Sequence, residues 1–307
     1  MKELHGVLVV DKPGGPTSHD VVESVRRGLG VKRAGHTGTL DPFATGVLVV
    51  CLGQATRLVR FLASGEKLYR ARVRLGFATS TDDLLGEPLA PPASRLPSDE
   101  DVRAACAKLV GPLRQVPPAF SAKRVAGRRA YDLARRGGAP ELDAVPVTVH
   151  RLELLALDGA LLDIEVRCSA GTYVRALARD LGRDLGVGGH LVELRRLRAD
   201  GFGLEQAVSL DEVGSRPDAV LPLAALLPEL PPVQVGELGR EALRHGRDLP
   251  RRLVVSGFPE RPAPERLRIV DEAGALLALA VPRDFESRTA ALPIEPMLHP
   301  DVVLLRA

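Results

Sequence analysis

The sequence predicts a mixed α/β domain followed by a small β-rich domain. Short apolar or alternating segments, typical of strands, are separated by segments with helical spacing, which favours a mixed α/β fold. Prolines interrupt this pattern at 222–232, and a hairpin-like pattern follows them. A chain of 307 residues has room for about two domains. We therefore expect a larger first domain at residues 1–230 and a second domain at residues 231–307.

The N-terminal elements are marked by an apolar run, a helix cap and a second apolar run. Val7–Val10 ends in a turn rich in proline and glycine, which indicates a buried strand. Thr17 and Asp20 have the spacing of a helix cap, and apolar residues then recur at helical spacing until Gly30. Val47–Leu52 is predicted as a second buried strand.

Two later segments alternate as half-buried strands do. In Leu68–Leu75 the apolar residues and Tyr69 share one face, and three arginines share the other, which predicts a strand with a basic outer face. Leu162–Cys168 alternates in the same way. A turn at 169–172 then leads into a helix with a buried stripe formed by Val174, Leu177, Ala178, Leu181 and Leu185.

The last elements are a capped helix and a hairpin. Ser209–Glu212 has the pattern of a capping box, so we expect a helix to begin there. Leu267–Val270 and Ala275–Val281 flank a short segment that contains Gly274, which predicts a hairpin in the C-terminal domain.

The loop before Val47 contains one carboxylate, Asp41, that is a candidate for chemistry. Pro42 restricts Asp41 to extended backbone conformations. Three nearby glycines permit turns or a close approach of substrate; they are Gly35, Gly38 and Gly46. The same spacing suits a purely structural alternative, in which Asp41 caps a helix that begins at Pro42.

The clearest indication of nucleic-acid binding is local. The net charge of +3 is too small to indicate such binding by itself. All three tyrosines, however, lie beside arginines; they are Tyr69, Tyr131 and Tyr173. Aromatic rings with neighbouring guanidinium groups suit unpaired RNA bases and their phosphates. The most basic stretch contains Lys123, Arg124, Arg128, Arg129, Arg135 and Arg136, although a solvated helix face or a disordered loop would also explain such a stretch.

Three arginines recur every fourth residue in the helix that follows Thr172. Arg175, Arg179 and Arg183 would repel one another along one face unless an anion lies nearby. Acidic side chains from elsewhere in the fold could cover them, or RNA phosphates and Asp41 could do so. The sequence does not distinguish these alternatives.

Composition indicates a cytoplasmic protein without a metal site or a membrane span. The three cysteines are widely separated, and no Cys/His cluster has the spacing of metal ligands, so we expect small buried thiols in a reducing compartment. The apolar stretch near the N-terminus is too short for a signal peptide. No segment has the length needed to cross a bilayer.

Six segments together resemble a known family. GHTGTLDPFATGVLVVCLGQATR, which includes Asp41, is similar to the active-site segment of pseudouridine synthases of the bacterial TruB type. DKPGGPTSHDVV, Lys67-Leu-Tyr69 and PPAFSAKRVAGRRAYDLARRG resemble that family's first motif, its second strand motif and its RNA-binding insertion. CSAGTYVRALARDLG and LRRLRADGF complete the set in the expected order, up to about residue 202.

The resemblance implies a fold and an activity. The expected fold is a pseudouridine-synthase fold of the α/β (α+β) class, with a mixed, largely antiparallel central sheet and the active cleft across its middle. Residues 113–140 would form a mobile RNA-binding insertion, and residues 231–307 a PUA-like RNA-binding domain. The expected reaction converts one uridine in the T-loop of transfer RNA to pseudouridine without a cofactor. We expect the enzyme to act as a monomer.

The resemblance also implies residue roles. Asp41 would be the catalytic carboxylate, acting as nucleophile at ribose C1′ or as the base that removes a ribose proton. Arg175 would orient Asp41 and lower its pKa. Tyr69 would stack on the flipped base and take part in catalysis by helping to exchange the C5 proton, with a buried core tyrosine as the alternative. The remaining residues assigned to substrate binding are His36, Tyr173, Leu194, Lys12, Arg124 and Arg128. His36 would assist extrusion of the base, or would be a hydrogen-bonded loop residue, and Lys12 could instead shape a turn.

Three residues depart from the family pattern, and two other functions remain open. Ala170 stands where a lysine is usual, Arg124 replaces a lysine and Phe120 replaces a tyrosine. Arginine and lysine are not interchangeable at close phosphate contacts. A non-catalytic RNA-binding or RNA-folding protein would need no carboxylate at position 41. A nucleoside hydrolase or glycosylase would use Asp41 as nucleophile.

Overall fold

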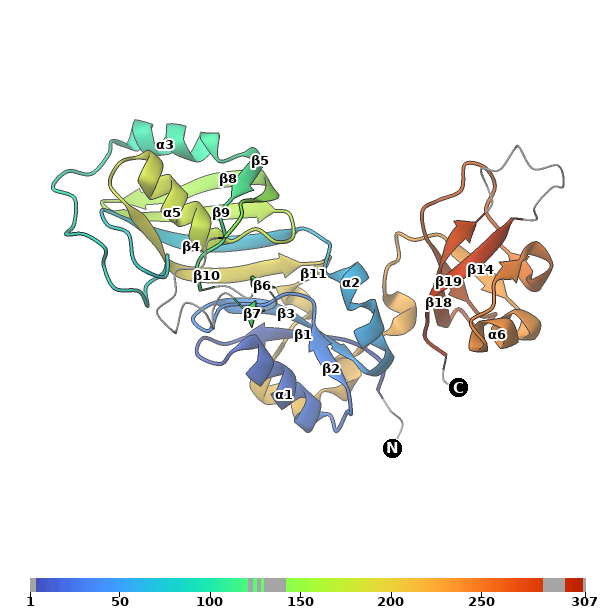
Figure 1. Ribbon diagram of the computed structural model, residues 1–307. Helices are drawn as coiled ribbons and strands as arrows, with labels where there is room; N and C mark the ends of the chain where they lie inside the picture. Colours follow the sequence, from blue (N-terminus) through green and yellow to red (C-terminus); the bar gives the residue numbers. More distant parts are fainter. Residues whose placement is uncertain (1–3, 121–123, 126–127, 130–141, 284–295, 306–307) are drawn as a thin grey trace.

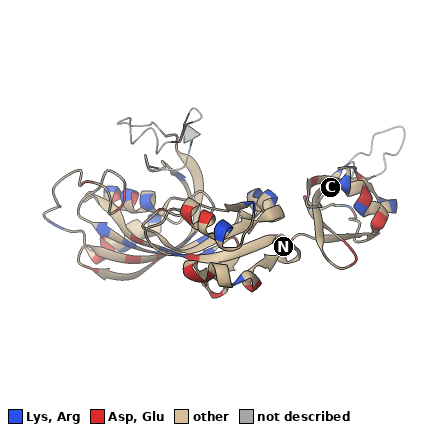
Figure 2. Ribbon diagram, turned by 90° about the horizontal axis from the view of Figure 1, so that it is seen from below, with Lys and Arg blue, Asp and Glu red and all other residues tan. Residues whose placement is uncertain are grey.

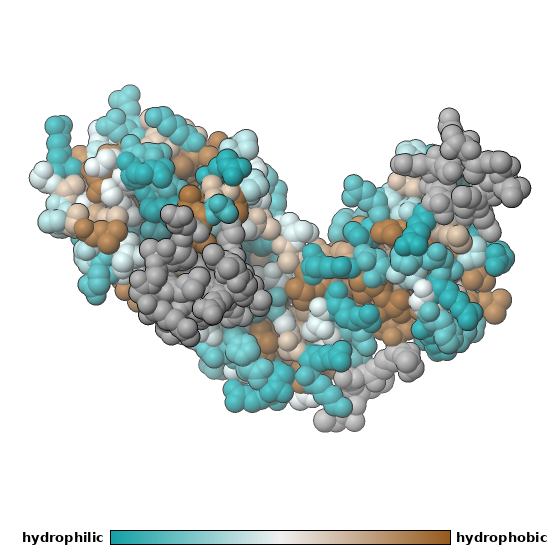
Figure 3. All heavy atoms as spheres, in the orientation of Figure 1, coloured by the Kyte–Doolittle hydropathy of each residue, from teal (hydrophilic) through white to brown (hydrophobic). Residues whose placement is uncertain are grey.

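The computed structural model describes residues 4–120, 124–125, 128–129, 142–283 and 296–305, which form two lobes (Figure 1). The larger lobe is built on an 11-stranded sheet and the smaller lobe on a 6-stranded sheet. The lobes leave a broad notch between them on one face of the molecule (Figure 3). The architecture is a mixed α/β lobe followed by a β-rich lobe, as predicted.

The large sheet runs β12-β1-β3-β10-β4-β9-β8-β5, with β2, β11 and β13 paired beside this path. Only the β1–β12 and β3–β10 pairings are parallel, so the sheet is mixed and largely antiparallel, as expected. Its strands are β1 Gly6–Lys12, β2 Ala34–His36, β3 Thr45–Leu52, β4 Lys67–Leu75, β5 Gly111–Gln115, β8 Val145–Asp158, β9 Leu161–Cys168, β10 Gly189–Ala199, β11 Phe202–Gly203, β12 Val208–Ser209 and β13 Leu221–Pro222.

The helices of the large lobe lie against this sheet, with α3 and α5 over the β4–β9–β8 half and α1 beside β1 and β2 (Figure 1). The α-helices are α1 Ser18–Gly28, α2 Val59–Leu62, α3 Asp99–Lys108 and α5 Val174–Asp184. The 3-10 helices are η1 Gly53–Leu58, η2 Leu204–Gln206, η3 Leu210–Ser215, η4 Pro217–Ala219 and η5 Leu223–Ala225.

The small lobe begins at β14. Its elements are β14 Pro232–Val235, α6 Glu237–Arg244, β15 Leu249–Pro250, η6 Arg251–Leu253, β16 Val254–Ser256, β17 Leu267–Val270, β18 Leu276–Arg283 and β19 Met297–Val303. The predicted hairpin is confirmed, since β17 and β18 pair antiparallel around Gly274, whose φ is 80°. Leu276 and Leu279 share a hydrophobic cluster with Val7 and Val49 of the large lobe. The division at residue 230 into separate domains, and the PUA-like character of the second, stay predictions.

Local sequence signals explain most elements of the large lobe. The Thr17 hydroxyl accepts a hydrogen bond from the Asp20 backbone amide, and the Asp20 carboxylate accepts one from the Thr17 amide, which completes the predicted cap of α1. The capping box at Ser209 is also present, but it opens the 3-10 helix η3 and no α-helix. The three cysteines are buried and free, as expected.

The alternation of β4 is confirmed, but its outer face is not basic overall. Tyr69 and Val73 are buried on the inner face. On the outer face Arg72 contacts Asp163 of β9 at 2.7 Å and Glu193 of β10 at 3.1 Å. Figure 2 shows basic and acidic positions interspersed along the strands. Neighbouring strands therefore supply cross-strand partners that the alternation within β4 does not reveal.

Most of the predicted insertion lies outside the described residues, including Tyr131 and Lys123. Within it, β6 (Arg124–Val125) and β7 (Arg128–Arg129) pair antiparallel as a separate two-stranded sheet. The segment up to Phe120 is described and runs from β5 toward the helix α5.

Among the three glycines near Asp41, Gly46 occupies a position where the surrounding backbone leaves no room for a side chain. Its φ is 101°, and a Cβ atom there would lie 2.2 Å from the carbonyl oxygen of Arg196. This close approach allows β3 and β10 to pair. Gly35, in contrast, has open space where a Cβ would be placed.

Replacing Gly46 with Ala should lower the free energy of unfolding by roughly 2–4 kcal/mol, because a left-handed φ and a backbone clash act together. Urea denaturation would measure the change. Gly35→Ala is the matched control and should leave stability nearly unchanged. Equal destabilisation by the two substitutions would contradict this account of the β3–β10 pairing.

Candidate active site

Asp41 lies in a tight turn between β2 and β3. The Ala44 amide donates to the Asp41 carbonyl at 3.1 Å, and no helix begins at Pro42, so the alternative in which Asp41 caps a helix is wrong. The Ser18 hydroxyl fixes the preceding residue by donating to the Leu40 carbonyl at 3.0 Å and accepting from its amide at 2.8 Å. The Asp41 side chain is 29% exposed, so the carboxylate is accessible although its loop is held firmly.

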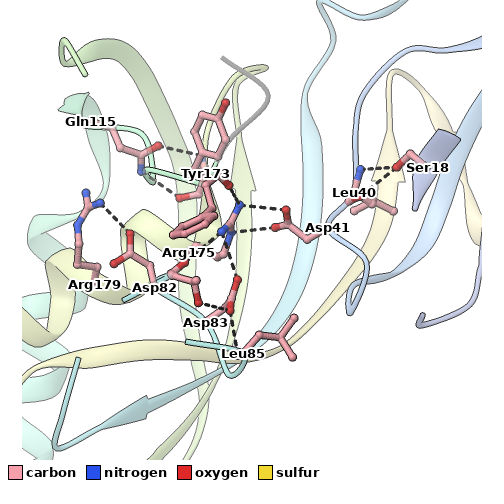
Figure 4. A network of polar contacts seen from close by, with 12 residues as sticks. Ser18, Leu40, Asp41, Asp82, Asp83, Leu85, Gln115, Tyr173, Arg175 and Arg179 are labelled. Atoms are coloured by element: carbon pink, nitrogen blue, oxygen red, sulfur yellow. Dashed lines mark hydrogen bonds and ion pairs between the residues drawn. The ribbon is translucent and has the colours of Figure 1, made fainter. Parts of the chain in front are cut away.

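Arg175 contacts both oxygens of the Asp41 carboxylate through two guanidinium nitrogens. Its Nε lies 2.9 Å from Oδ2, and its Nη2 donates to Oδ1 at 3.0 Å (Figure 4). Arg175 is in the first turn of α5, and its side chain is only 5% exposed. A planar guanidinium paired with both carboxylate oxygens fixes direction as well as charge. The structure thus brings together the two residues that the resemblance associates.

A second carboxylate, Asp83, lies on the other side of Arg175. Nη1 of Arg175 donates to Asp83 Oδ2 at 3.2 Å, and Asp83 itself accepts from the Thr81 hydroxyl and the Leu85 amide. The Asp83 side chain is 6% exposed. Sequence reasoning missed this residue; its available signal was a pair of adjacent aspartates, Asp82 and Asp83, close after two threonines.

The three stacked arginines of α5 are covered by carboxylates of the protein. Arg179 contacts Asp82 at 2.9 Å and Asp180 at 3.1 Å. Arg183 also contacts Asp180, at 3.0 Å. Both alternatives therefore hold in part, because acidic side chains from the fold cover the helix while Arg175 also binds Asp41.

Residues 115–120, at the start of the predicted insertion, are hydrogen-bonded to α5 and to Tyr173 directly before it. The Gln115 amide group donates to the Tyr173 carbonyl at 3.1 Å and accepts from the Tyr173 amide at 2.8 Å. Arg179 donates to the Val116 carbonyl at 2.8 Å, and Arg175 donates to the Phe120 carbonyl at 2.8 Å. Residues 115–120 are thereby connected to the same helix that holds Asp41.

Lys12 stabilises the Asp41 turn through hydrogen bonds to its backbone carbonyls. Its Nζ donates to the carbonyls of Pro13, Pro42 and Ala44 at 2.7–3.0 Å, and the residue is fully buried. Burial lowers the pKa of Lys12 to about 8, although the nearby Asp41 charge acts in the opposite direction. This geometry favours the turn-shaping role for Lys12 and adds a positive charge behind Asp41.

Tyr69 and Leu194 lie in one apolar cluster with Leu40 and Ala44 of the Asp41 turn. Each is 8% exposed. Burial raises the pKa of the Tyr69 hydroxyl, and the Arg196 guanidinium only partly offsets this effect. A neutral, largely buried ring therefore adjoins the turn that presents Asp41.

Arg196 is a buried cation that sequence reasoning missed. It is 2% exposed, and it donates through Nε to the Val47 carbonyl at 2.7 Å and through Nη2 to the Gly38 carbonyl at 3.0 Å. Its only signal in the sequence was its place within a run of arginines in β10. The contacts connect β10 to the loop before Asp41.

His36 is the last residue of β2, directly before the loop that leads to Asp41. Burial lowers its pKa, and the positive charges of Arg196 and His19 act in the same direction. Its Nδ1 is buried without a hydrogen bond to the described residues. A neutral imidazole at neutral pH follows from this environment.

Burial is the largest influence on the pKa of the Asp41 carboxyl and raises it above the ordinary aspartate value. Arg175 and Lys12 lower this pKa, whereas the Asp83 charge raises it further. The lowering effect predicted for Arg175 is therefore confirmed, but burial outweighs it and the net direction is upward.

Other predicted features are either undescribed or absent from this part of the chain. The side chains of Arg124 and Arg128 lie outside the described structure. No group of three or more His, Cys, Asp or Glu among the described residues is placed to hold a metal ion. In the same residues no helix has the length and apolar character that a bilayer span requires.

Comparison with protein families gives two matches along the chain. Residues 26–174 match a model described as TruB family pseudouridylate synthase (N terminal domain). Residues 175–220 match a model described as tRNA pseudouridylate synthase B C-terminal domain.

Named relatives are similar over most of their length. The chain is 45% identical over 282 residues to tRNA pseudouridine synthase B of Solibacter usitatus, which covers 90% of this chain and 95% of that protein. It is 53% identical over 222 residues to the protein of the same name from Mycobacterium ulcerans, covering 71% and 74%. For the Thermobifida fusca protein of that name the identity is 51% over 241 residues, covering 75% and 80%.

Solved structures share the whole fold. A chain in a structure of an H/ACA ribonucleoprotein bound to a substrate RNA matches with a TM-score of 0.70 and 25% identity, covering 98% of this chain and 86% of that one. A chain of a Cbf5-Nop10-Gar1 complex matches with a TM-score of 0.71 and 27% identity, covering 98% and 85%.

The pH dependence of kcat/KM should report the environment of Asp41. If Asp41 acts as the carboxylate, activity is lost as pH falls through its raised pKa. Asp83→Asn removes a charge that raises this pKa, so the acidic limb should move to lower pH. Arg175→Gln removes a charge that lowers it, so the limb should move to higher pH.

Glu193→Gln on the outer face is the control and should leave the limb in place. Identical acidic limbs in the parent and both site variants would contradict the assignment of that limb to Asp41.

Proposed function

The chain belongs to the TruB family of pseudouridylate synthases and is a pseudouridine synthase; from this membership we propose that it isomerises one uridine in the T-loop of transfer RNA, with Asp41 as the catalytic carboxylate. The relatives' shared name, tRNA pseudouridine synthase B, supports transfer RNA as the substrate. The two-nitrogen contact between Arg175 and Asp41 is the observation that carries the proposal for the catalytic residue. We further propose that the enzyme is cytoplasmic and acts as a monomer.

The reaction requires one well-placed carboxylate. The bond between uracil N1 and ribose C1′ breaks, the base turns, and C5 joins C1′ with no net redox change. Asp41 serves this reaction as nucleophile at C1′ or as the base that removes a ribose proton. Arg175 occupies one edge of the carboxylate, and the exposed part of Asp41 remains for the sugar.

The environment of Asp41 suits either role. A carboxylate with a raised pKa is a stronger base and nucleophile than an ordinary aspartate. Arg175 and Lys12 counteract burial and thereby favour the ionised form that both roles need. These opposing influences support the reactivity of the Asp41 carboxylate.

The neighbouring side chains suit a nucleotide that has left its stack. Extruding a base requires surfaces that replace its lost stacking. We assign this function to Tyr69, with Leu194 and Tyr173 lining the nucleoside pocket and His36 assisting extrusion. The burial of Tyr69 and Leu194 beside the Asp41 turn supports this arrangement. Lys12 supports the turn, and Arg124 and Arg128 are proposed to bind RNA phosphates.

Asp41→Asn should abolish pseudouridine formation while changing the affinity for transfer RNA by less than about 3-fold, because only the reacting oxygen is altered. Product would be measured on transcribed transfer RNA, with mapping of the modified position. Asp163→Asn on the outer face is the matched control and should retain activity. Pseudouridine formation by the Asp41→Asn variant would overturn the proposed role.

The same assay separates the competing functions. Isomerisation leaves the RNA mass unchanged, whereas a glycosylase releases free uracil. A non-catalytic RNA-binding protein would bind transfer RNA and yield neither product.

Transfer-RNA affinity should fall steeply with salt, because the insertion is rich in Lys and Arg. Replacing Arg124 or Arg128 with Ala should weaken binding and reduce the slope of log K against log salt by roughly 1 for each lost phosphate contact. Filter binding at several salt concentrations measures this. Arg151→Ala in β8 is the control, and a slope that is unchanged in both insertion variants would argue against phosphate contacts there.

A further inference from the structure

We infer that Thr37 is a positioning residue for catalysis, held by a buried ion pair between Asp200 and Lys67; the inference rests on the proposed roles of Asp41 and Tyr69. Thr37 lies between His36 and Gly38, in the loop that leads to Asp41. The ion pair connects this loop to β4, which carries Tyr69, and to the turn after β10. The three residues set the position of the loop relative to Tyr69, whereas Arg175 acts on Asp41 from α5.

Asp200 is the centre of the cluster. Its side chain is 1% exposed, with Oδ1 at 2.9 Å from Lys67 Nζ and Oδ2 accepting from the Thr37 hydroxyl at 2.7 Å. Its φ of 56° places it in the left-handed region, in the turn between β10 and β11. A Cβ on Gly65 would lie 2.9 Å from the Asp200 Cα, so the backbones pack closely here.

Lys67 has three partners inside the protein. Besides the ion pair with Asp200, its Nζ donates hydrogen bonds to the carbonyls of Ala63 at 2.9 Å and Gly65 at 2.7 Å. The side chain is 8% exposed, and the residue lies two positions before Tyr69 in β4. A buried ion pair often stabilises a fold no better than apolar packing of the same volume. Stability alone therefore gives little reason for a charge pair at this place, whereas fixed geometry does.

Thr37 connects the pair to the catalytic loop. Its backbone amide donates to the Val49 carbonyl at 3.1 Å, and the neighbouring Gly38 carbonyl accepts from Arg196. These backbone contacts remain when the Thr37 hydroxyl is removed, so the loop should stay folded. Removing the hydroxyl eliminates only the side-chain contact that aligns the loop with Asp200.

The two ends of the loop are thus fixed from different elements. Arg175 holds Asp41 from α5, and Asp200 holds Thr37 from the β10–β11 turn. A small displacement of reacting groups is enough to reduce a rate strongly, because catalysis depends on near-attack geometry. Loss of the Thr37 contact should therefore affect the chemical step more than RNA binding.

The test compares Thr37→Val with Thr37→Ser in the full-length enzyme on transcribed transfer RNA. Thr37→Val keeps the shape but removes the hydroxyl, and kcat should fall roughly 10- to 100-fold while the RNA dissociation constant changes less than about 3-fold. Thr37→Ser restores the hydroxyl and should return kcat to within about 3-fold of the parent. Asp200→Asn should also reduce kcat, and adding Thr37→Val to it should cause little further loss, because both act through one contact.

Controls separate this inference from general destabilisation and from failure of the proposed function. Thr56→Val removes another hydroxyl bonded to a carbonyl, that of Gly53, and should leave kcat unchanged. Melting temperatures are measured for every variant. A parental kcat in Thr37→Val, or a loss that Thr37→Ser does not rescue, would overturn the inference. Asp41→Asn in the same assay tests the proposed role of Asp41 separately, since pseudouridine formation by that variant would refute that role whatever Thr37 does. A parent enzyme that forms no pseudouridine would refute the proposed function.

Discussion

The buried guanidinium of Arg175 is the constraint on which the rest of the site depends. It has five N–H donors. Five acceptors lie within 3.2 Å of it: both oxygens of Asp41, Oδ2 of Asp83, and the carbonyls of Thr81 and Phe120. These acceptors come from three separate segments, so one side chain aligns the Asp41 turn, the loop after β4 and residues 115–120. Removing it would leave two carboxylates close together without their shared partner, which is strongly unfavourable in a buried site.

Charges of both signs surround Asp41 and shift its pKa in opposite directions. Asp41 and Asp83 carry negative charge, whereas Arg175 and Lys12 carry positive charge. Burial raises the pKa of Asp41 and lowers that of Lys12, so it weakens both charges while their mutual attraction restores them. The outcome is a carboxylate that is directed by Arg175 and still accessible at 29% of its side-chain surface. This combination supports the proposed reaction better than a fully solvated aspartate would.

Arginines paired with carboxylates of the protein differ in their physical consequences from those of the basic stretch at 123–136. Arg72 of β4 and Arg179 of α5 are matched by carboxylates from a neighbouring strand and a turn, and Arg183 by Asp180 of its own helix. Such pairs contribute little affinity for an external anion, because binding would have to displace an existing partner. The basic stretch in the insertion has few acidic residues near it in the sequence. It is therefore the better candidate for phosphate contacts, and this supports its proposed role in RNA binding.

The sequence by itself determined the local elements and the identity of the principal candidate residue. The cap at Thr17, the alternation of β4 and the buried stripe of α5 follow from neighbours within a turn or a strand, and all three were predicted correctly. Only the tertiary structure decided which charges meet. Arg175 and Asp83 are 92 positions apart, and Thr37 and Asp200 are 163 positions apart. No periodicity connects residues at such distances, because their contact depends on strand register and on the docking of α5. The net rise in the pKa of Asp41 was missed for the same reason, since burial is a property of the assembled fold.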